Sequence, residues 1–286
     1  MKSETKAVIA LIGASLFWST GGLFIKLVNW NGFAISGTRS LIAGLVLLTY
    51  LRKPKFNWSF PQMAAAFSSA CTMTLYVLAN KMTTAANTIL LQYTAPVYVA
   101  ILGWIILREK PTKDNWIALL IIVGGMLLFF ADRLSPGNMY GNVLAILSGI
   151  FLAFFAVFMR MQKDGSPFES FLLAHLIAFI ISTPFIFRSP LPDISGWLGI
   201  FMLGIFQLGL ASLLFSYGIK YVSALKSMLI LTLEPILNPV WVFLFTGEAP
   251  GIYAILGGLV IIIAVLFTTI YSAKRERIAA AAAEIL

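Results

Sequence analysis

Polar side chains inside strongly apolar stretches are the residues of this sequence best placed to do chemistry. Glu234 lies about twelve residues into the apolar stretch 222–245, which places its carboxylate deep in a hydrocarbon layer. An ionised carboxylate in that setting must be paired, hydrated or protonated. We therefore expect Glu234 to bind a positive group of a solute or to carry a proton, and a structural ion pair is the alternative. Asn238 and Gln92 are candidate hydrogen-bond partners for a bound solute.

Three other ionisable side chains lie within or near apolar stretches. Arg39, about eight residues into the stretch 32–51, could pair with a helix end or with carbonyl groups, and the sequence favours that structural role. His175 is interpreted as a packing residue, and Lys226 is expected to extend its amine to the membrane surface. With one histidine and the single cysteine Cys71, the chain lacks the residues for an internal disulfide or a His/Cys metal cluster. No metal or cofactor is expected.

Three prolines lie close to these polar residues. Pro235 and Pro239 follow Glu234, and Pro96 follows the polar run Gln92-Tyr93-Thr94. Because proline has no backbone N–H and clashes with the preceding turn, each is expected to interrupt or bend its helix. Interrupted helices at matching places in two halves of a chain are a typical position for a solute site. A packing kink is the alternative.

Aromatic residues make up 14% of the chain, and four Trp and Tyr residues are more interior than the tryptophans near span ends. They are Trp18, Tyr76, Tyr93 and Tyr217. Each could stack on a solute or pack in the protein interior, and the sequence leaves both interpretations open.

The composition indicates that these residues lie in a membrane. Of 286 residues, 60% are hydrophobic and 11% are charged, and the mean hydropathy is +0.93. Soluble domains have about 25% charged residues. Stretches of about 20 apolar residues cross a bilayer as helices. Ten are expected, at 6–28, 32–51, 61–80, 85–107, 114–131, 139–160, 167–187, 195–219, 222–245 and 250–272.

The net charge of +9 follows from basic residues in the short connectors, which argues for membrane orientation and against nucleic-acid binding. With a cytoplasmic N-terminus, only Lys81, Arg133 and Arg188 fall in outside loops, against fourteen basic residues inside. These fourteen are Lys2, Lys6, Arg52, Lys53, Lys55, Arg108, Lys110, Lys113, Arg160, Lys163, Lys220, Lys274, Arg275 and Arg277. Both termini are therefore expected in the cytoplasm, in a multi-pass protein of the plasma (inner) membrane.

The two halves of the chain resemble each other at an offset of 139 residues. The matching pairs are Leu75/Leu214, Lys81/Lys220, Ala85/Ala224, Leu90/Leu229, Pro96/Pro235, Glu109/Glu248 and Pro111/Pro250. Each half has five spans, an odd number, so the second half enters the membrane from the opposite side. We expect an all-α membrane protein of two inverted five-helix repeats, 1–134 and 135–273, followed by a cytoplasmic tail at 274–286.

Together these motifs resemble the drug/metabolite transporter superfamily, in its ten-helix EamA-type exporter branch. The likeness covers nearly the whole chain, and five residue patterns carry it, some of which occur at matching positions in both halves. The motifs are Ser15-Leu16-Phe17-Trp18, Thr38-Arg39-Ser40-Leu41-Ile42-Ala43, Tyr93-Thr94-Ala95-Pro96 with Leu107-Arg108-Glu109-Lys110-Pro111, Leu233-Glu234-Pro235 with Thr246-Gly247-Glu248-Ala249-Pro250, and the glycine-rich fifth and tenth spans. The resemblance implies export or exchange of amino acids or related metabolites, through a cavity lined mainly by spans 1, 3, 4, 6, 8 and 9.

The leading interpretation is a secondary transporter that works by alternating access, with a small-molecule substrate and membrane lipid as its partners. A monomer would suffice, and a homo-oligomer is compatible with the sequence. A channel is an alternative, but no filter-like segment or charged ring is present. A membrane-embedded enzyme is the other, but the chain offers no Ser–His or Asp pair in a membrane setting. No Gly-rich Lys-Ser/Thr phosphate loop is present either, so this chain alone is not expected to hydrolyse ATP.

Overall fold

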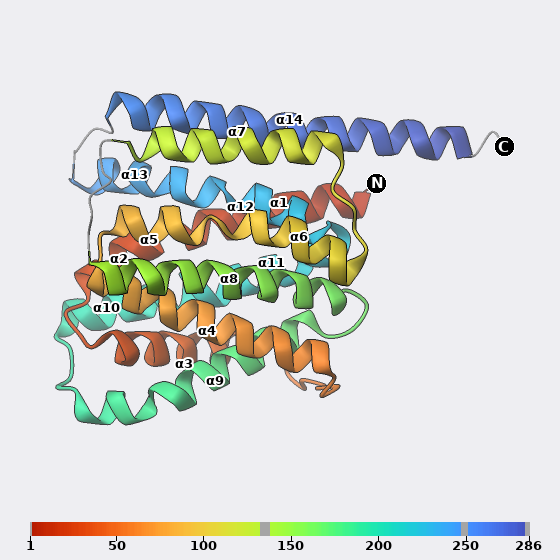
Figure 1. Ribbon diagram of the computed structural model, residues 1–286. Helices are drawn as coiled ribbons and strands as arrows, with labels where there is room; N and C mark the ends of the chain where they lie inside the picture. Colours follow the sequence, from red (N-terminus) through yellow and green to blue (C-terminus); the bar gives the residue numbers. More distant parts are fainter. Residues whose placement is uncertain (1, 132–137, 247–250, 284–286) are drawn as a thin grey trace.

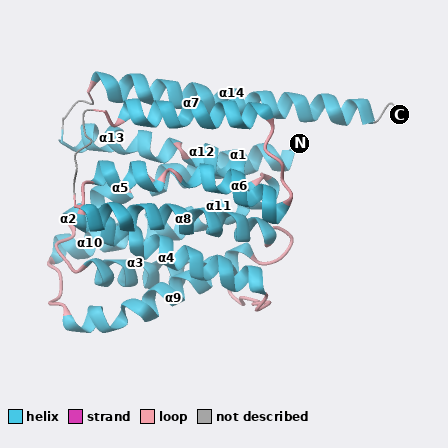
Figure 2. Cartoon of the chain, in the orientation of Figure 1, coloured by secondary structure: helices cyan, strands magenta, loops and turns pink. Residues whose placement is uncertain are grey.

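The computed structural model describes residues 2–131, 138–246 and 251–283, although some side chains within these ranges, including those of Lys26, 238–240 and 268–283, lie outside the description. Over the described residues the chain is entirely helical, with no strand (Figure 2). This is the architecture that a bilayer requires of such an apolar chain, because an α-helix satisfies its backbone polar groups internally.

The helices coincide with the ten expected spans, several of which are divided. The first five spans are α1 (Lys2–Trp18) with α2 (Gly21–Leu27), α3 (Gly32–Leu51), α4 (Phe60–Met82), α5 (Ala85–Gln92) with α6 (Ala95–Leu107), and α7 (Lys113–Phe129). The others are α8 (Met139–Met161), α9 (Pro167–Arg188), α10 (Ile194–Met202) with the π-helix η1 (Leu203–Leu210) and α11 (Ala211–Tyr221), α12 (Ala224–Leu231) with α13 (Leu233–Thr246), and α14 (Ile252–Ala283). Among the described residues, seven segments are long and apolar enough to cross a membrane, and Ile252–Phe267 of α14 is a shorter apolar helix.

Side-chain caps begin many of these helices, and two of the caps occupy equivalent places in the two halves. The Thr84 hydroxyl accepts from the Asn87 N–H at the start of α5, and the Ser223 hydroxyl accepts from the Lys226 N–H at the start of α12. The two caps are 139 residues apart, which is the offset of the sequence repeat. Each satisfies one of the N–H groups that a helix start leaves without an intrahelical partner.

An acidic cap begins α10. The Asp193 carboxylate accepts from the Gly196 N–H and from the Ser195 hydroxyl, at 2.8 and 2.9 Å. These hydrogen bonds favour the ionised form and lower the pKa of Asp193. Its negative charge also suits the positive end of the helix dipole.

The helices lie side by side in one bundle, with both termini at the same end (Figure 1). α1–α2 runs from that end to the opposite one, whereas α8, the first helix of the second half, runs back toward it (Figure 1). The two halves therefore have opposite topology, as the odd number of spans in each requires. The precise division at residues 134 and 135 stays a prediction.

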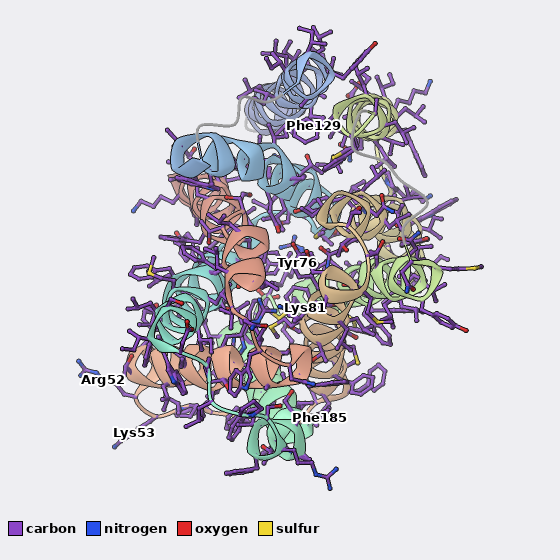
Figure 3. All side chains as sticks on the ribbon, turned by 90° about the vertical axis from the view of Figure 1, so that its left-hand side faces the viewer. Arg52, Lys53, Tyr76, Lys81, Phe129 and Phe185 are labelled. Atoms are coloured by element: carbon purple, nitrogen blue, oxygen red, sulfur yellow. The ribbon has the colours of Figure 1, made fainter. Side chains whose placement is uncertain are left out.

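Packing between the halves follows the same symmetry. α1 packs on α11, and α4 packs on α8, so the first span of each half contacts the third span of the other. α3 packs on α9, and α7 packs on α14, so the second and fifth spans contact their own equivalents. An end-on view shows Tyr76 of α4 in the middle of the bundle, Phe129 of α7 beside α14, and Arg52 and Lys53 at its outer edge (Figure 3).

Small residues allow α7 and α14 to approach closely. A Cβ added at Gly257 of α14 would lie 2.6 Å from the Gly125 carbonyl oxygen of α7. Lipid tails are as apolar as the helix surfaces, so such van der Waals contact between backbones is what holds membrane helices together. Gly124, one residue away, has open space at the equivalent position.

Gly257→Ala should therefore destabilise the fifth-to-tenth span contact, while Gly124→Ala should not. Overpacking typically costs about 1–3 kcal/mol, and the helix-propensity gain of Gly→Ala is the same for both variants. The check is the thermal unfolding midpoint of each purified variant in detergent. Equal midpoints for the two variants would show that the α7–α14 contact is not close-packed.

Candidate functional site

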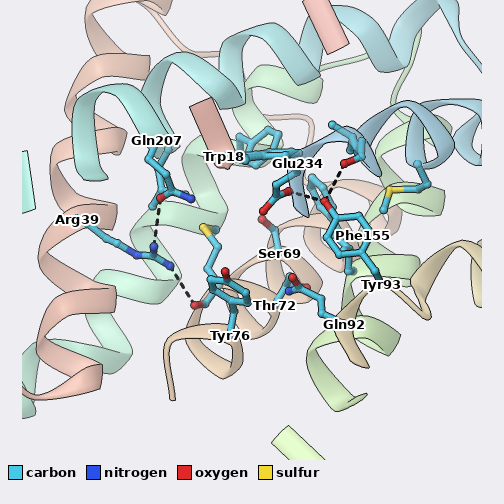
Figure 4. Close-up of a pocket in the computed structure, with 16 residues that line it drawn as sticks. Trp18, Arg39, Ser69, Thr72, Tyr76, Gln92, Tyr93, Phe155, Gln207 and Glu234 are labelled. Carbon is cyan, nitrogen blue, oxygen red and sulfur yellow. Dashed lines mark hydrogen bonds between the residues drawn. The ribbon is translucent and has the colours of Figure 1, made fainter. Parts of the chain in front are cut away.

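A cavity lies at the centre of the bundle, between the two halves. It has a volume of about 620 Å³, open solvent included. Side chains from α1, α3, α4, α5, α8, α9, η1, α12 and α13 line it (Figure 4). Spans 2 and 7 thus contribute through Arg39 and Phe171, in addition to the spans that the family resemblance implied.

Glu234 and Tyr93 face each other across the two interrupted spans. The Tyr93 hydroxyl donates to Glu234 Oε2 at 2.6 Å and is also 2.9 Å from the Leu231 carbonyl oxygen. In a regular helix the Leu231 carbonyl would accept from the N–H of residue 235, but Pro235 has none. The proline therefore releases an acceptor, and the tyrosine of the other half lies against it.

The interruptions are similar in the two halves. α5 ends at Gln92 and α6 begins at Ala95, while α12 ends at Leu231 and α13 begins at Leu233. Thr94 donates its hydroxyl to the Leu91 carbonyl, and Thr232 donates to the Leu229 carbonyl, at 2.7 and 2.6 Å. These hydrogen bonds satisfy backbone acceptors where the helices break, which a site buried in hydrocarbon requires.

Gln92 is held by the neighbouring helix. Its amide donates to the Ser148 hydroxyl of α8 at 2.7 Å, and Ser148 donates to the Thr72 carbonyl of α4 at 3.1 Å. This chain of hydrogen bonds joins α5, α8 and the backbone of α4 along one polar wall of the cavity.

Arg39 occupies the opposite side of the cavity from Glu234 (Figure 4). It donates to Gln207 Oε1 in η1 and to the Met73 carbonyl in α4, each at 3.2 Å. Gly21, directly after the break between α1 and α2, makes room for the Gln207 amide, because a Cβ there would lie 2.9 Å from its nitrogen. The break in span 1 and the π-helix in span 8 therefore meet where Gly21 packs against Gln207, the residue that binds Arg39.

Aromatic rings form another part of the wall. Phe155 of α8 packs against Phe171 of α9 and Phe215 of α11, with ring centroids 5.0 and 5.3 Å apart. Trp18, the last residue of α1, packs on Phe215 at 5.5 Å. A solute in the cavity would therefore contact both charged groups and apolar faces.

The structure brings together five of the seven residues that the sequence analysis proposed for binding: Trp18, Tyr76, Gln92, Tyr93 and Glu234 all line the cavity. Tyr217 does not line it, and its ring packs on Tyr221 at 5.3 Å. Residues two apart on a helix point in nearly opposite directions, so while Phe215 faces the aromatic wall, Tyr217 turns away from it. The side chain of Asn238 lies outside the described residues.

The helix-breaking prolines are placed as follows. Pro96 and Pro235 lie in the first turns of α6 and α13, directly after the interruptions, and both are buried. Proline is tolerated at this position because a first-turn N–H has no intrahelical partner. The side chain of Pro239 lies outside the described residues, and the backbone of α13 continues through that position as helix.

Sequence reasoning missed several lining residues and misplaced one side chain. Arg39 bonds a carbonyl, as expected, but it also lines the cavity, together with Ser69, Thr72 and Gln207. Gln207 had a usable signal, because it is an amide inside an otherwise apolar span. Lys226 was expected to reach the membrane surface, but it is 7% exposed and its amine binds Glu4 Oε1 of α1 at 2.7 Å.

Within the described part of the chain, His175 is not grouped with other potential metal ligands. His175 is fully buried, and its Nε2 lies 3.2 Å from the Ser212 hydroxyl, which fits a packing role. Among the residues that the structure describes, no group of three or more His, Cys, Asp or Glu side chains could hold a metal ion.

Comparison with known proteins gives consistent results. The model of the EamA-like transporter family matches the chain twice, at residues 5–131 and 139–270. The uncharacterized transporter YwfM of Bacillus subtilis (strain 168) is 26% identical over 261 residues, covering 87% of this chain and 88% of that protein. YxxF, another uncharacterized transporter of that organism, is 24% identical over 298 residues, covering 99% and 96%. Human solute carrier family 35 member G1 is 30% identical over 184 residues, covering 57% and 49%.

The fold is also found among solved structures. One crystal structure superposes with a TM-score of 0.79 at 18% sequence identity, over 94% of this chain and 98% of that one. At this identity the likeness concerns the fold alone. The family model, in contrast, covers most of the chain in two successive copies that match its two halves. The chain belongs to the EamA-like transporter family and is a multi-pass membrane transporter.

Proposed function

We propose that the chain is a secondary transporter that moves small metabolites, amino acids or related solutes, across the plasma membrane by export or exchange. The observation that carries this proposal is the Glu234 carboxylate. It lines the central cavity, it accepts from Tyr93, and among the described residues no basic side chain lies within ion-pair distance. A carboxylate in that setting favours a solute with a positive group.

Alternating access is the proposed mechanism. The cavity lies between two inverted halves, and such halves can rock around a fixed central site and expose it to each side in turn. Interrupted helices on both sides of the cavity supply the joints at which the halves can change their relative tilt. A channel or a membrane-embedded enzyme remains the alternative, and neither uses the paired interruptions at Tyr93 and Thr232.

At the end of the bundle that carries the termini, one group of contacts ties the helices together, and we call it the inner latch. Arg160 at the end of α8 pairs with Glu109 after α6, with Nε and Oε1 2.8 Å apart. The same arginine donates to the Ile219 and Lys220 carbonyls at the end of α11, and Glu109 accepts from the Ala224 N–H that begins α12. The inner latch thus joins spans 4, 6, 8 and 9, and it must open for the cavity to face that side.

The chemical role of Glu234 is tested by transport. Glu234→Gln should weaken binding of a cationic or zwitterionic solute by about tenfold to a hundredfold, because a hydrogen bond to a charged group is worth about 1.5–3 kcal/mol. Tyr93→Phe keeps the carboxylate and should have a smaller effect. The measurement is uptake of a panel of amino acids and metabolites into proteoliposomes, with and without a proton gradient, per folded molecule.

The outcomes of this assay separate the three roles of Glu234. A lost pH response in Glu234→Gln with substrate affinity retained would assign proton transfer to it. Lower thermal stability with unchanged transport per folded molecule would make it a structural group. A wild-type rate, affinity and pH response together would remove Glu234 from the site.

The inner latch predicts a conformational effect. Breaking a partly exposed ion pair costs about 1 kcal/mol, so Glu109→Gln should raise the population open at that end about fivefold. The measurement uses a Cys71→Ser background with a cysteine at Ser69, which lines the cavity. In inside-out vesicles, a larger open population should make an impermeant thiol reagent label that cysteine faster. Asp164→Asn removes the exposed pair with Lys163 and is the matched control. Equal labelling rates for both variants would contradict the role of the latch.

Both termini are proposed to be cytoplasmic, because basic residues gather at their end of the bundle. An impermeant thiol reagent added outside intact cells should label a cysteine at Arg188, which is exposed at the opposite end, and should not label one at Lys55 or Lys113. The opposite pattern would invert the orientation and would place the inner latch on the outer face.

A further inference from the structure

Arg39 is a cation without a counter-ion in the described structure. Its side chain is 1% exposed, and its two hydrogen-bond acceptors, Gln207 Oε1 and the Met73 carbonyl, are both neutral. Its Nε has no hydrogen-bond partner among the described residues. A guanidinium offers five donors, and a charge buried in a membrane protein is costly unless an opposite charge accompanies it.

Glu234 does not supply that opposite charge. No ion pair joins the two residues among those described, and the two side chains lie on opposite sides of the cavity, with Tyr76 on the wall between them (Figure 4). The cavity therefore has a positive pole and a negative pole with space between them.

We propose that Arg39 binds the carboxylate of a small zwitterionic solute whose positive group lies at Glu234. This inference rests on the proposed function and narrows it, because a cation that lacks a carboxylate would leave Arg39 unpaired and would be a poor substrate. The planar guanidinium suits a carboxylate, since it can form two parallel hydrogen bonds to the two oxygens. The donors that Gln207 and Met73 leave unused are available for this contact.

Gln207 is a positioning residue that acts through Arg39. It lies in the middle of η1, and π-helical turns inside α-helices are frequent at functional sites. Its amide lies against Gly21 on one side and holds a guanidinium nitrogen on the other. Replacing this amide with a carboxylate would give Arg39 an internal counter-ion and would leave the solute no free cation to bind.

A purely structural Arg39 is the competing explanation, in which the residue only ties α3 to α4 and η1. The two explanations differ in their effect on stability. A buried charge without a counter-ion carries a desolvation cost, so replacing it with an apolar side chain of similar length should not lower the stability. Removing a structural tie destabilises the fold.

The experiment uses the full-length chain purified in detergent and compares Arg39→Met, Gln207→Glu and the exposed control Arg188→Met with the wild type. Thermal midpoints are measured alone, with an equimolar mixture of alanine, serine, leucine and phenylalanine, and with the matched mixture of their primary amides. The amides keep the positive group and lack the carboxylate. Both mixtures are titrated, so that each protein yields an apparent affinity.

We expect the amino acids, but not the amides, to raise the midpoint of the wild type and of Arg188→Met. Arg39→Met should unfold no earlier than Arg188→Met, yet its affinity for the amino acids should fall by at least about tenfold, as for the loss of a charge-assisted hydrogen bond. Gln207→Glu should unfold later than the wild type and should likewise lose protection.

Several results would overturn the inference. One is that the amides raise the midpoint of the wild type as strongly as the amino acids do. Another is that the amino acids still raise the midpoint of Arg39→Met or of Gln207→Glu. A third is that Arg39→Met unfolds early while Gln207→Glu still binds the amino acids. No protection of the wild type by the acids would also overturn it. Transport of another solute that depends on Glu234 would then leave the proposed function standing, so the two failures are distinguishable.

Discussion

The structure depends on the requirement that each backbone polar group inside the membrane finds a partner within the protein. Pro235 breaks this rule locally, because it leaves the Leu231 carbonyl without its helical N–H. The Tyr93 hydroxyl, from the equivalent interruption in the other half, lies 2.9 Å from that carbonyl and donates to Glu234. One missing N–H thereby links the two halves at the place where the cavity forms.

The inverted repeat explains why these features come in pairs. Thr84 and Ser223 cap equivalent helices, and at each interruption a threonine, Thr94 or Thr232, donates its hydroxyl to the carbonyl three residues earlier. The two halves therefore interrupt a helix in hydrocarbon in a similar way. Because the halves enter the membrane from opposite sides, their interruptions meet at the middle of the bundle, where a site is equally far from both surfaces.

The charged groups of the cavity break this symmetry. The region of the first half that matches Glu234 is Gln92-Tyr93-Thr94-Ala95-Pro96. This region contains no acidic residue. Arg39 has no basic counterpart at the matching place of α9, where His175 packs nearby against Ser212. The two halves thus place an acidic and a basic side chain on opposite walls of the cavity, and under the proposed function these would orient a zwitterionic solute.

The sequence by itself determined the membrane class, the ten spans, the inverted repeat and the central place of Glu234, Pro96 and Pro235. It could do so because hydropathy, proline chemistry and the offset of 139 residues are local or periodic properties of the chain. The roles assigned to the binding residues stay predictions. Which side chains share the cavity depended on helix rotation and on contacts between distant residues. Tyr217 turns away from the cavity on α11, while Arg39 meets Gln207, 168 positions later in the chain. Lys226 is buried against Glu4 because α1 and α12 pack together. Only tertiary structure decides such pairings, since apolar spans are alike on every face until their neighbours are in place.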